Sequence, residues 1–302
     1  MTSELVRLQE VSKAFQGRVA VDRVSLSIGR GEVVALLGPN GAGKSTTLAL
    51  MLGHVRPTHG DVLLRGVSVV RDRRRALRAV GVVLDRPAFH DYLTGWDNLV
   101  RLVSYSVAPD DAAMRDAVGF VGLDDRIHDR VGTYSHGMRQ RLALAQALVP
   151  APDVVLLDEP ADGLDPDGVA TIHRMIERLS RERGVAVMIA SHLLSEIEQV
   201  CDRVVILDRG RLVFDGPWDA RDGGPERVCL ELDDWTRARP LLVSAGATLL
   251  DGGLVELAAG AAVAGLVRVL VQGGVRVSGV TRVRPTLADV YRRATSAPES
   301  GT

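Results

Sequence analysis

The sequence has little of what marks disulfide-bonded, metal-binding or membrane-spanning proteins. Its two cysteines, Cys201 and Cys229, are too few and too far apart in sequence to indicate a disulfide framework, a metal knuckle or a redox pair. No apolar run reaches the ~20 residues that a membrane-spanning helix needs, because charges or glycines interrupt each one. The richest stretch, 258–271, contains Arg268 and two glycines. We therefore expect inert thiols and no transmembrane helix.

Neither sign of charge is in excess, since 37 basic residues face 38 acidic ones. This balance gives no overall field that would attract nucleic acid or an anionic membrane. The first residues also lack the basic start and apolar core of a signal peptide. The length suggests about two domains of ~150 residues each. We expect a soluble, cytoplasmic, globular protein that does not bind nucleic acid and takes any membrane role from a partner.

Residues 38–46 match the phosphate-binding motif G-x-x-x-x-G-K-[ST] in full, between a buried apolar run at 32–37 and an expected helix at 47–52. The motif comprises Gly38, Pro39, Asn40, Gly41, Ala42, Gly43, Lys44, Ser45 and Thr46. Its three glycines predict positive φ and a close backbone approach, so that N–H groups can point at phosphate oxygens. Lys44 can reach the β- and γ-phosphates of a nucleotide, and Ser45 offers Mg²⁺ a hydroxyl. The alternative is a glycine-rich turn without a ligand.

Acidic and imidazole side chains follow three other expected strands. They are Asp158 and Glu159 after 154–157, Asp85 after 79–84, and Ser191 and His192 after 184–190. Ligands bind at the carboxyl ends of strands in open α/β sheets. Beside a phosphate-binding loop, Asp158 is expected to hold Mg²⁺ and Glu159 to polarise a water. The alternatives are two carboxylates that only cap the next turn and a histidine that is only hydrogen-bonded.

Three further features lie on expected helix starts and turns. Ser135 is a natural N-cap for a helix at 139–148. The start of that helix would be a second site able to bind an anion. Phe15 lies at the edge of a turn between strands 5–11 and 18–28, where core packing is more typical than stacking on an adenine. The arginine run 71–75 is typical of a solvated helix face, with a phosphate or partner site as the alternative.

The element pattern predicts an α/β domain at 1–216 with a helical subdomain at about 87–148. A glycine- and proline-containing stretch at 217–226 indicates a linker. Beyond it, 227–296 follows the order β-α-β-β-α-β of a ferredoxin-like α+β domain and ends in a further helix. We expect this second domain to stabilise a dimer, and we expect 297–302 to be a frayed tail.

Taken together, these residues resemble the ATP-binding subunit of an ABC transporter over about 5–215. Residues 38–46 look like Walker A, 154–158 like Walker B, and Glu159 like the catalytic glutamate. The switch-histidine loop is similar to Ser191-His192, the D-loop to Gly163-Leu164-Asp165, and the signature to Tyr134-Ser135-His136-Gly137-Met138. The resemblance implies a P-loop NTPase fold that binds ATP and Mg²⁺.

A single nucleotide-binding half precedes a small domain that ends in Thr286-Leu287-Ala288-Asp289-Val290-Tyr291. This arrangement most resembles the ATPases of ABC-2-type exporters, including the daunorubicin and bacitracin resistance type. The resemblance implies a subunit that powers export through a separate membrane permease, on the inner face of the membrane. The alternatives are a soluble ABC ATPase that remodels ribosomes, DNA or a protein complex, and a regulatory module in which ATP sets a conformation.

Three positions depart from the family pattern. The signature has His136 where glycine is common and Met138 where glutamine is common, while Ser135 and Gly137 are kept. Asp85 occupies the Q-loop position, where the shorter acid can bind Mg²⁺ but cannot donate an amide hydrogen bond. Phe15 replaces the usual tyrosine of the adenine-stacking loop and loses only the hydroxyl.

The resemblance also implies a mechanism that needs two copies of the chain. ATP would lie between 38–46 of one subunit and 135–137 of the other, in a head-to-tail homodimer. Glu159 would act as general base, and His192 would orient the γ-phosphate and the attacking water.

Overall fold

The computed structural model of the chain describes residues 4–84, 87–106, 108–218, 227–258, 261–283 and 286–296. It divides into two compact units, one of Met1–Trp218 with Arg293–Thr302 and one of Asp219–Arg292. Asp85, the expected tail at 297–302, and residues 219–226 of the expected linker lie outside the described residues.

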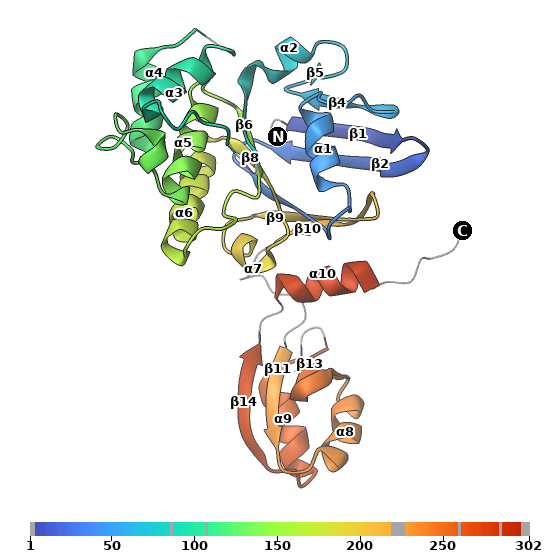
Figure 1. Ribbon diagram of the computed structural model, residues 1–302. Coiled ribbons are helices and arrows are strands. Elements are labelled where there is room, and N and C mark those ends of the chain that lie inside the picture. The colour runs from blue at the N-terminus through green and yellow to red at the C-terminus, as the bar shows by residue number, and fades with distance from the viewer. Residues whose placement is uncertain are drawn as a thin grey trace. The chain divides into compact units, whose positions relative to one another are not determined.

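The larger sheet of the first unit has the strand order β10-β9-β3-β8-β7-β6. Its strands are β3 Val33–Leu37, β6 Val80–Val83, β7 Val154–Asp158, β8 Ala186–Ser191, β9 Arg203–Asp208 and β10 Arg211–Pro217. All pairs are parallel except β9 with β10. The side chains of β3 and β8 are buried along their whole length, as the near-continuous apolar runs predict. Because β3, β8 and β7 are parallel neighbours, their carboxyl ends meet at one edge (Figure 1).

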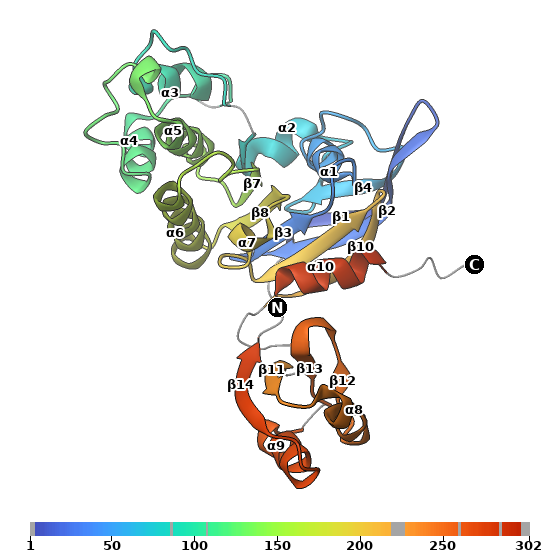
Figure 2. The same ribbon diagram turned by 60° about the horizontal axis from the view of Figure 1, so that its bottom comes forward.

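A second, antiparallel sheet has the order β2-β1-β4-β5. Its strands are β1 Glu4–Phe15, β2 Arg18–Gly29, β4 His59–Leu64 and β5 Val67–Ser68. Helix α1, Lys44–Met51, leads from β3 and packs beside this sheet (Figure 2). A shared core joins both sheets to α1, with fully buried side chains from each, such as Val6, Leu36 and Met51. This core fixes the turn between β3 and α1 at both of its ends.

The remaining helices described in the first unit are α2 Arg73–Ala76, η1 Leu77–Ala79, α3 Gly95–Val103, α4 Asp111–Phe120, η2 Val131–Thr133, α5 His136–Leu148, α6 Pro166–Arg183 and α7 Leu194–Ile197. Side-chain caps begin α2, α3, α4, α5 and α6, from Asp72, Thr94, Asp110, Ser135 and Asp165. Thr94 Oγ1 accepts a hydrogen bond from the Asp97 backbone N–H, so it is the N-cap of α3. Helices α3 and α4 each contact α5, and together they form the helical part of this unit (Figure 1).

The second unit has the predicted order and the topology of a ferredoxin-like fold. Its elements are β11 Arg227–Leu232, α8 Trp235–Ser244, β12 Thr248–Leu249, η3 Asp251–Gly253, β13 Leu254–Glu256, α9 Val263–Gln272 and β14 Val277–Val283. Helix α10, Leu287–Ser296, begins in this unit, and its residues from Arg293 onward belong to the first unit. The sheet order is β12-β13-β11-β14, with every pair antiparallel. Strands β11 and β12 therefore run parallel to each other with β13 between them, which is the split β-α-β arrangement.

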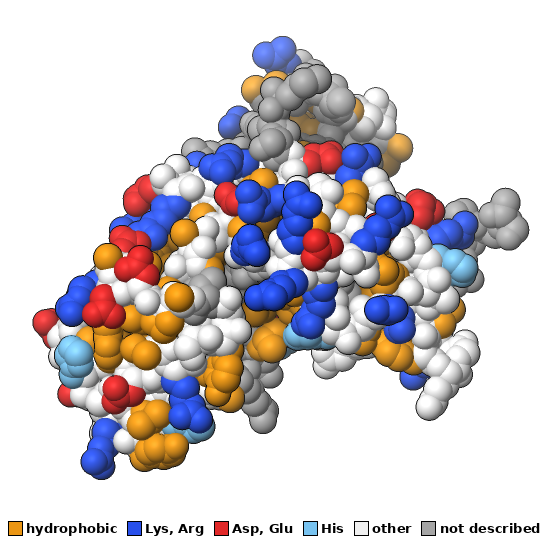
Figure 3. All heavy atoms as spheres, turned by 90° about the horizontal axis from the view of Figure 1, so that it is seen from above, with side chains coloured by type: hydrophobic (Ala, Val, Ile, Leu, Met, Phe, Trp, Pro, Cys, Tyr) orange, Lys and Arg blue, Asp and Glu red, His pale blue; other side chains and the backbone are white. Residues whose placement is uncertain are grey.

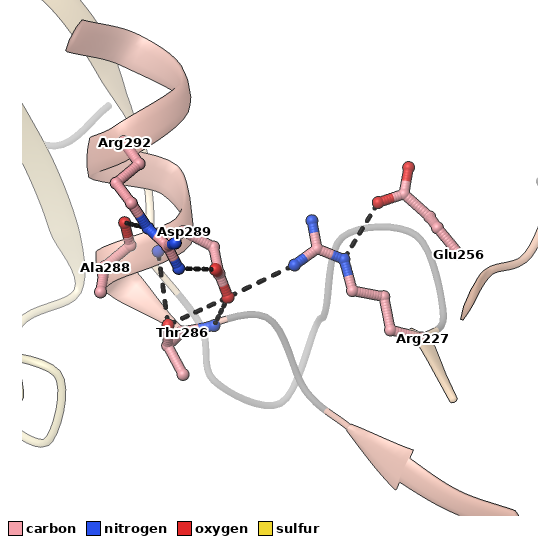
Figure 4. Close-up of polar contacts among 6 residues, drawn as sticks. All are labelled: Arg227, Glu256, Thr286, Ala288, Asp289 and Arg292. Carbon is pink, nitrogen blue, oxygen red and sulfur yellow. Dashed lines mark hydrogen bonds and ion pairs between the residues drawn. The ribbon is translucent and has the colours of Figure 1, made fainter. Parts of the chain in front are cut away.

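An ion-pair cluster joins β11 to the start of α10 in this unit (Figure 4). The side chain of Arg227 is only 4% exposed and pairs with Glu256 at 3.0 Å and with Asp289 at 3.3 Å. Asp289 also accepts hydrogen bonds from the backbone N–H and the hydroxyl of Thr286. The backbone bond from Thr286, followed by the bond from its hydroxyl and the charges of Arg227 and Arg292, holds the pKa of Asp289 below its ordinary value.

The structure bears on the expectations of an inert cysteine thiol and of no membrane-spanning helix. Cys201 is buried, and burial raises the pKa of its thiol to about 12, so it is unreactive as predicted. Among the described residues, none of the helices combines the length and the apolar character needed to cross a bilayer. Strand β10 extends to Pro217, the first residue of the expected linker, and pairs Gly216 and Pro217 with β9.

Candidate active site

The loop between β3 and α1 lines a cavity of about 260 Å³ at the carboxyl edge of the larger sheet. Gly41 and Gly43 have φ of 81° and 108°, in the region that favours glycine, as predicted. The prediction of positive φ was wrong for Gly38, which lies outside that region. Glycine is needed there for space, because an added Cβ would collide with the carbonyl oxygen of Leu207 on β9.

Lys44 is held inside this loop. The residue is only 8% exposed, and its Nζ donates a hydrogen bond to the Gly38 carbonyl at 2.6 Å. Burial lowers the pKa of Lys44, and the nearby carboxylates of Glu159 and Asp158 oppose that effect. The ammonium therefore lies between a ring of backbone groups and two acids, at the start of a helix. This is an arrangement suited to a polyanion.

The two predicted acids, Asp158 and Glu159, line the same cavity as the loop. Asp158 is the last residue of β7, and Glu159 turns the chain away from the sheet with φ of 48°. The backbone N–H of Glu159 still donates to the Ala190 carbonyl of β8 at 2.9 Å, which fixes where its side chain starts. Neither acid caps the following helix, since Asp165 does that by accepting from Gly168 N–H.

His192 contacts Glu159 directly. The imidazole Nδ1 lies 2.8 Å from Glu159 Oε1, and the His192 backbone N–H lies 3.4 Å from Oε2. A carboxylate only accepts hydrogen bonds, so Nδ1 carries the hydrogen and Nε2 is left for another partner. The pair comes from the ends of adjacent strands β7 and β8 and joins a proton acceptor to an imidazole at the cavity edge.

The residues present fit a Mg²⁺ ion held together with phosphates. No cluster of three or more His, Cys, Asp or Glu side chains able to hold a metal occurs among the described residues. Mg²⁺ does not need such a cage, because it keeps water and is bound through one or two carboxylates plus substrate phosphates. The groups in the cavity lining that suit this role are the hydroxyl of Ser45 and the carboxylate of Asp158.

A second cavity, of about 500 Å³, lies at the start of α5. Its lining residues are Ser135, His136, Gly137, Arg141, Gly163, Leu164, Asp165, Asp167, Gly168, Thr171 and Ile172. Ser135 Oγ accepts from Met138 N–H at 3.2 Å and is the N-cap of α5, as predicted. His136 Nε2 lies 3.0 Å from the Asp162 carbonyl, so the ring joins α5 to the turn before α6. Met138 is buried and does not line this cavity.

The two cavities have no lining residue in common. The structure thus brings 38–46 together with Asp158, Glu159 and His192, and it brings 135–137 together with Asp165. Phe15 lines neither cavity; it is 44% exposed, and Lys13 Nζ lies 4.9 Å from the centroid of its ring. The ring of Phe15 therefore makes a cation–π contact with a residue of its own unit.

Several residues at these cavities were not found from the sequence. Ala20 of β2 lines the first cavity because β2 crosses beside Gly43, whose added Cβ would lie 2.6 Å from the Ala20 carbonyl oxygen. Asp162 takes part through its backbone carbonyl, which leaves no trace in residue type. Thr171 of α6 lines the second cavity together with residues at the start of α5, a neighbourhood that no local pattern specifies.

The chain is similar to several known proteins. The family model described as "ABC transporter" matches residues 21–162. The chain is 44% identical to the uncharacterized ABC transporter ATP-binding protein YhcH of Bacillus subtilis (strain 168), over 69% of this chain and 68% of that protein. It is 33% identical to YdbJ of the same organism, also an uncharacterized ABC transporter ATP-binding protein, over 98% and 97%. It is 35% identical to the bacitracin transport ATP-binding protein BcrA of Bacillus licheniformis, over 72% and 71%.

Solved structures match the first unit in fold. The structure of cbiO1 from Clostridium perfringens, part of the ABC transporter complex cbiONQ, superposes with a TM-score of 0.66 at 27% identity, over 71% of this chain and 89% of that chain. An ATP-binding cassette solved as a dimer in a post-hydrolysis state, bound to ADP and Pi, gives 0.63 at 23% identity, over 71% and 99%. The second of these likenesses bears on the fold alone.

Proposed function

The chain belongs to the ABC transporter family and is a nucleotide-binding subunit whose ATP hydrolysis drives transport; from this premise we propose that two copies hydrolyse ATP in shared sites. Each site takes 38–46, Glu159 and His192 from one copy and 135–137 from the other. The observation that carries the proposal is the separation of the two cavities, which share no lining residue within one chain. A second copy is therefore needed to bring the two sets of groups onto one nucleotide.

The phosphate side of the site is built from backbone and Lys44. The loop and the start of α1 line the cavity, and the N–H groups of a helix start carry partial positive charge. Lys44 adds a full charge at the β- and γ-phosphates. Ser45 and Asp158 would hold Mg²⁺, which supplies further neutralisation of the phosphate charge. These groups bind and orient the nucleotide.

Glu159 and His192 carry the proton step. Glu159 accepts the proton of the attacking water, and the hydrogen bond at 2.8 Å to Nδ1 holds its carboxylate in place. When the imidazole is protonated, Nε2 donates to a γ-phosphate oxygen as negative charge shifts there. Ser135 and Gly137 of the second copy offer a hydroxyl and the N–H groups of the α5 start to the same phosphate.

A mixing experiment tests the shared site. Lys44→Ala removes the loop cation and Ser135→Arg blocks the α5 start, so each variant alone is inactive. A mixed dimer of the two has one site with both halves intact and one with both altered. If subunits exchange freely, an equal mixture regains about a quarter of the wild-type ATPase rate, since half of the dimers are mixed and each has one working site.

The control is each variant mixed with itself at the same total concentration, with phosphate release as the measurement. A mixture no more active than its two parts would show that one chain completes its own site. That result would remove the second copy from the mechanism.

The partner is a separate permease that spans the membrane. The relative BcrA is a bacitracin transport ATP-binding protein, and the chain is 35% identical to it over 72% of the chain's length. We infer that this chain lies on the inner face of the membrane and powers export through that permease. Co-purification from membranes with an integral membrane protein is expected, and purification without one would contradict this assignment.

A further inference from the structure

Four arginines around α2 have no acidic partner. Arg71, Arg74, Arg75 and Arg78 are all exposed, and within the described part of the chain no carboxylate forms an ion pair with any of them. We call these four residues the α2 arginine patch. Residues 71–78 contain five arginines and one aspartate in a protein whose net charge is −1, so positive charge is concentrated here. The patch is a local feature that overall composition conceals.

Many other arginines of the first unit form ion pairs with carboxylates. Arg30 and Arg65 both reach Asp153, at 3.1 and 2.9 Å. On α6, Arg178 and Arg181 pair with glutamates one turn away. Exposed arginines on this unit thus commonly have a carboxylate within reach, which neutralises much of their field. The patch differs because four arginines that form no ion pair with another described residue lie within eight residues, so their combined charge is available to an outside partner.

The backbone beneath the patch is held in place. Asp72 Oδ1 accepts from the Arg75 backbone N–H and caps α2. Arg73, the fifth arginine, donates from Nε to the Leu52 carbonyl at 2.9 Å, at the C-terminal end of α1. The one acid in the segment is therefore used as a cap, and the one anchored arginine ties α2 to the core. The four patch arginines project from a fixed support.

The patch lies beside an exposed apolar residue and on a face with further basic side chains. Val70, directly before it, is 38% exposed. Figure 3 views the molecule from the side on which α2 lies and shows Lys and Arg side chains gathered across the middle of that face. A spread of unpaired guanidinium groups beside exposed apolar surface fits an extended array of phosphates better than one small anion.

We propose that the α2 arginine patch binds the anionic phospholipid headgroups of the bilayer surface next to the permease. This inference rests on the proposed function, because the permease brings the chain to a membrane. Guanidinium groups form paired hydrogen bonds with phosphate oxygens, and each basic residue near an anionic leaflet strengthens binding about fivefold. The patch would orient the subunit on the membrane and would do so without ATP.

Vesicle sedimentation of the full chain without nucleotide tests the proposal. The probes are phosphatidylcholine vesicles with and without phosphatidylglycerol. The variant carries Arg71→Gln, Arg74→Gln, Arg75→Gln and Arg78→Gln. The wild type should bind only the anionic vesicles, with binding that weakens as salt rises, and the variant should bind at least about tenfold more weakly.

The matched control removes the same charge from paired, exposed arginines: Arg126→Gln, Arg178→Gln, Arg181→Gln and Arg211→Gln. It should bind anionic vesicles within about twofold of the wild type, since these charges are already neutralised. If the fourfold variant does not fold, two double variants replace it, and each removes half of the patch charge. One carries Arg71→Gln and Arg74→Gln, and the other carries Arg75→Gln and Arg78→Gln.

Three results would overturn the proposal: equal binding of variant and wild type, equal binding to neutral and anionic vesicles, or displacement from vesicles by RNA at equal phosphate concentration. The ATPase rate in solution separates this proposal from the proposed function. The patch variant keeps that rate, because none of its residues lines the phosphate-binding cavity. A failure of ATP hydrolysis would instead affect every variant and leave vesicle binding intact.

Discussion

Replacing Glu159 by glutamine separates proton acceptance from side-chain position at the end of β7. The amide oxygen can still accept from His192 Nδ1, which lies 2.8 Å from Oε1. The amide nitrogen replaces Oε2 and loses a contact of 3.4 Å with the His192 backbone N–H. That loss costs at most about 1 kcal/mol, so the fold and the cavity are kept.

The catalytic cost is much larger than the structural one. An amide cannot take a proton from water, and a positioned general base contributes roughly 10²–10⁴ to the rate. This corresponds to about 3–5 kcal/mol of transition-state stabilisation. ATP affinity should stay the same or rise, because one negative charge leaves a cavity that also contains Asp158.

The assay is phosphate release at saturating Mg-ATP, with nucleotide affinity measured separately and molecular mass followed by light scattering. Glu159→Gln should bind ATP, hydrolyse it at least about a hundredfold more slowly and accumulate as a dimer. Glu177→Gln, which removes a carboxylate from a surface ion pair on α6, is the control and should be fully active. A hydrolysis rate for Glu159→Gln within about threefold of the wild type would refute the role of Glu159 as general base.

Three other substitutions have outcomes that the structure predicts. His192→Ala should lower hydrolysis about a hundredfold and leave ATP affinity nearly unchanged, as phosphate release and equilibrium binding would show. Lys44→Met should weaken ATP binding without lowering the melting temperature at neutral pH. Burial lowers the pKa of Lys44, because the charged ammonium is less stable in the folded chain than in the unfolded chain. The free energy of unfolding therefore rises with pH between the lowered pKa of the folded chain and the pKa of the unfolded chain. If Lys44→Met and the wild type bound ATP with equal affinity, the predicted role of Lys44 would be contradicted. Arg227→Met should destabilise the second unit by about 2 kcal/mol, less than a fully buried pair because Asp289 and Glu256 are partly exposed. Arg292→Met, which removes an exposed partner of Asp289, should change stability by less than about 1 kcal/mol in the same thermal melts, and an equal loss in both variants would contradict the assignment.

The pH response of the second unit follows from the same cluster. The pKa of Asp289 is lowered in the folded chain, chiefly by the hydrogen bond from the Thr286 backbone. Its contribution to stability is therefore full above the unfolded pKa and is lost as pH falls through the lowered folded value.

Much of the fold follows from short-range pattern. The caps at Thr94 and Ser135 were predictable because a side-chain oxygen bonds a backbone N–H only three residues away. The strand ends at Asp158 and Ser191 were predictable because apolar runs stop where polar side chains begin. The order of elements in the second unit followed from the same alternation, and its topology is the predicted one.

The sequence by itself determined the phosphate-binding loop, the acids at the strand ends and the order of both units, since each depends on residue type over a few neighbouring positions. Only the tertiary structure decided that Glu159 contacts His192, that Gly38 is glycine for lack of space beside Leu207, and that 135–137 line a cavity apart from the loop. It also decided that the arginines around α2 have no acidic partner in the described residues while others do. These facts depend on groups tens of residues apart in the chain, which sheet order and core packing bring together and which no local pattern specifies.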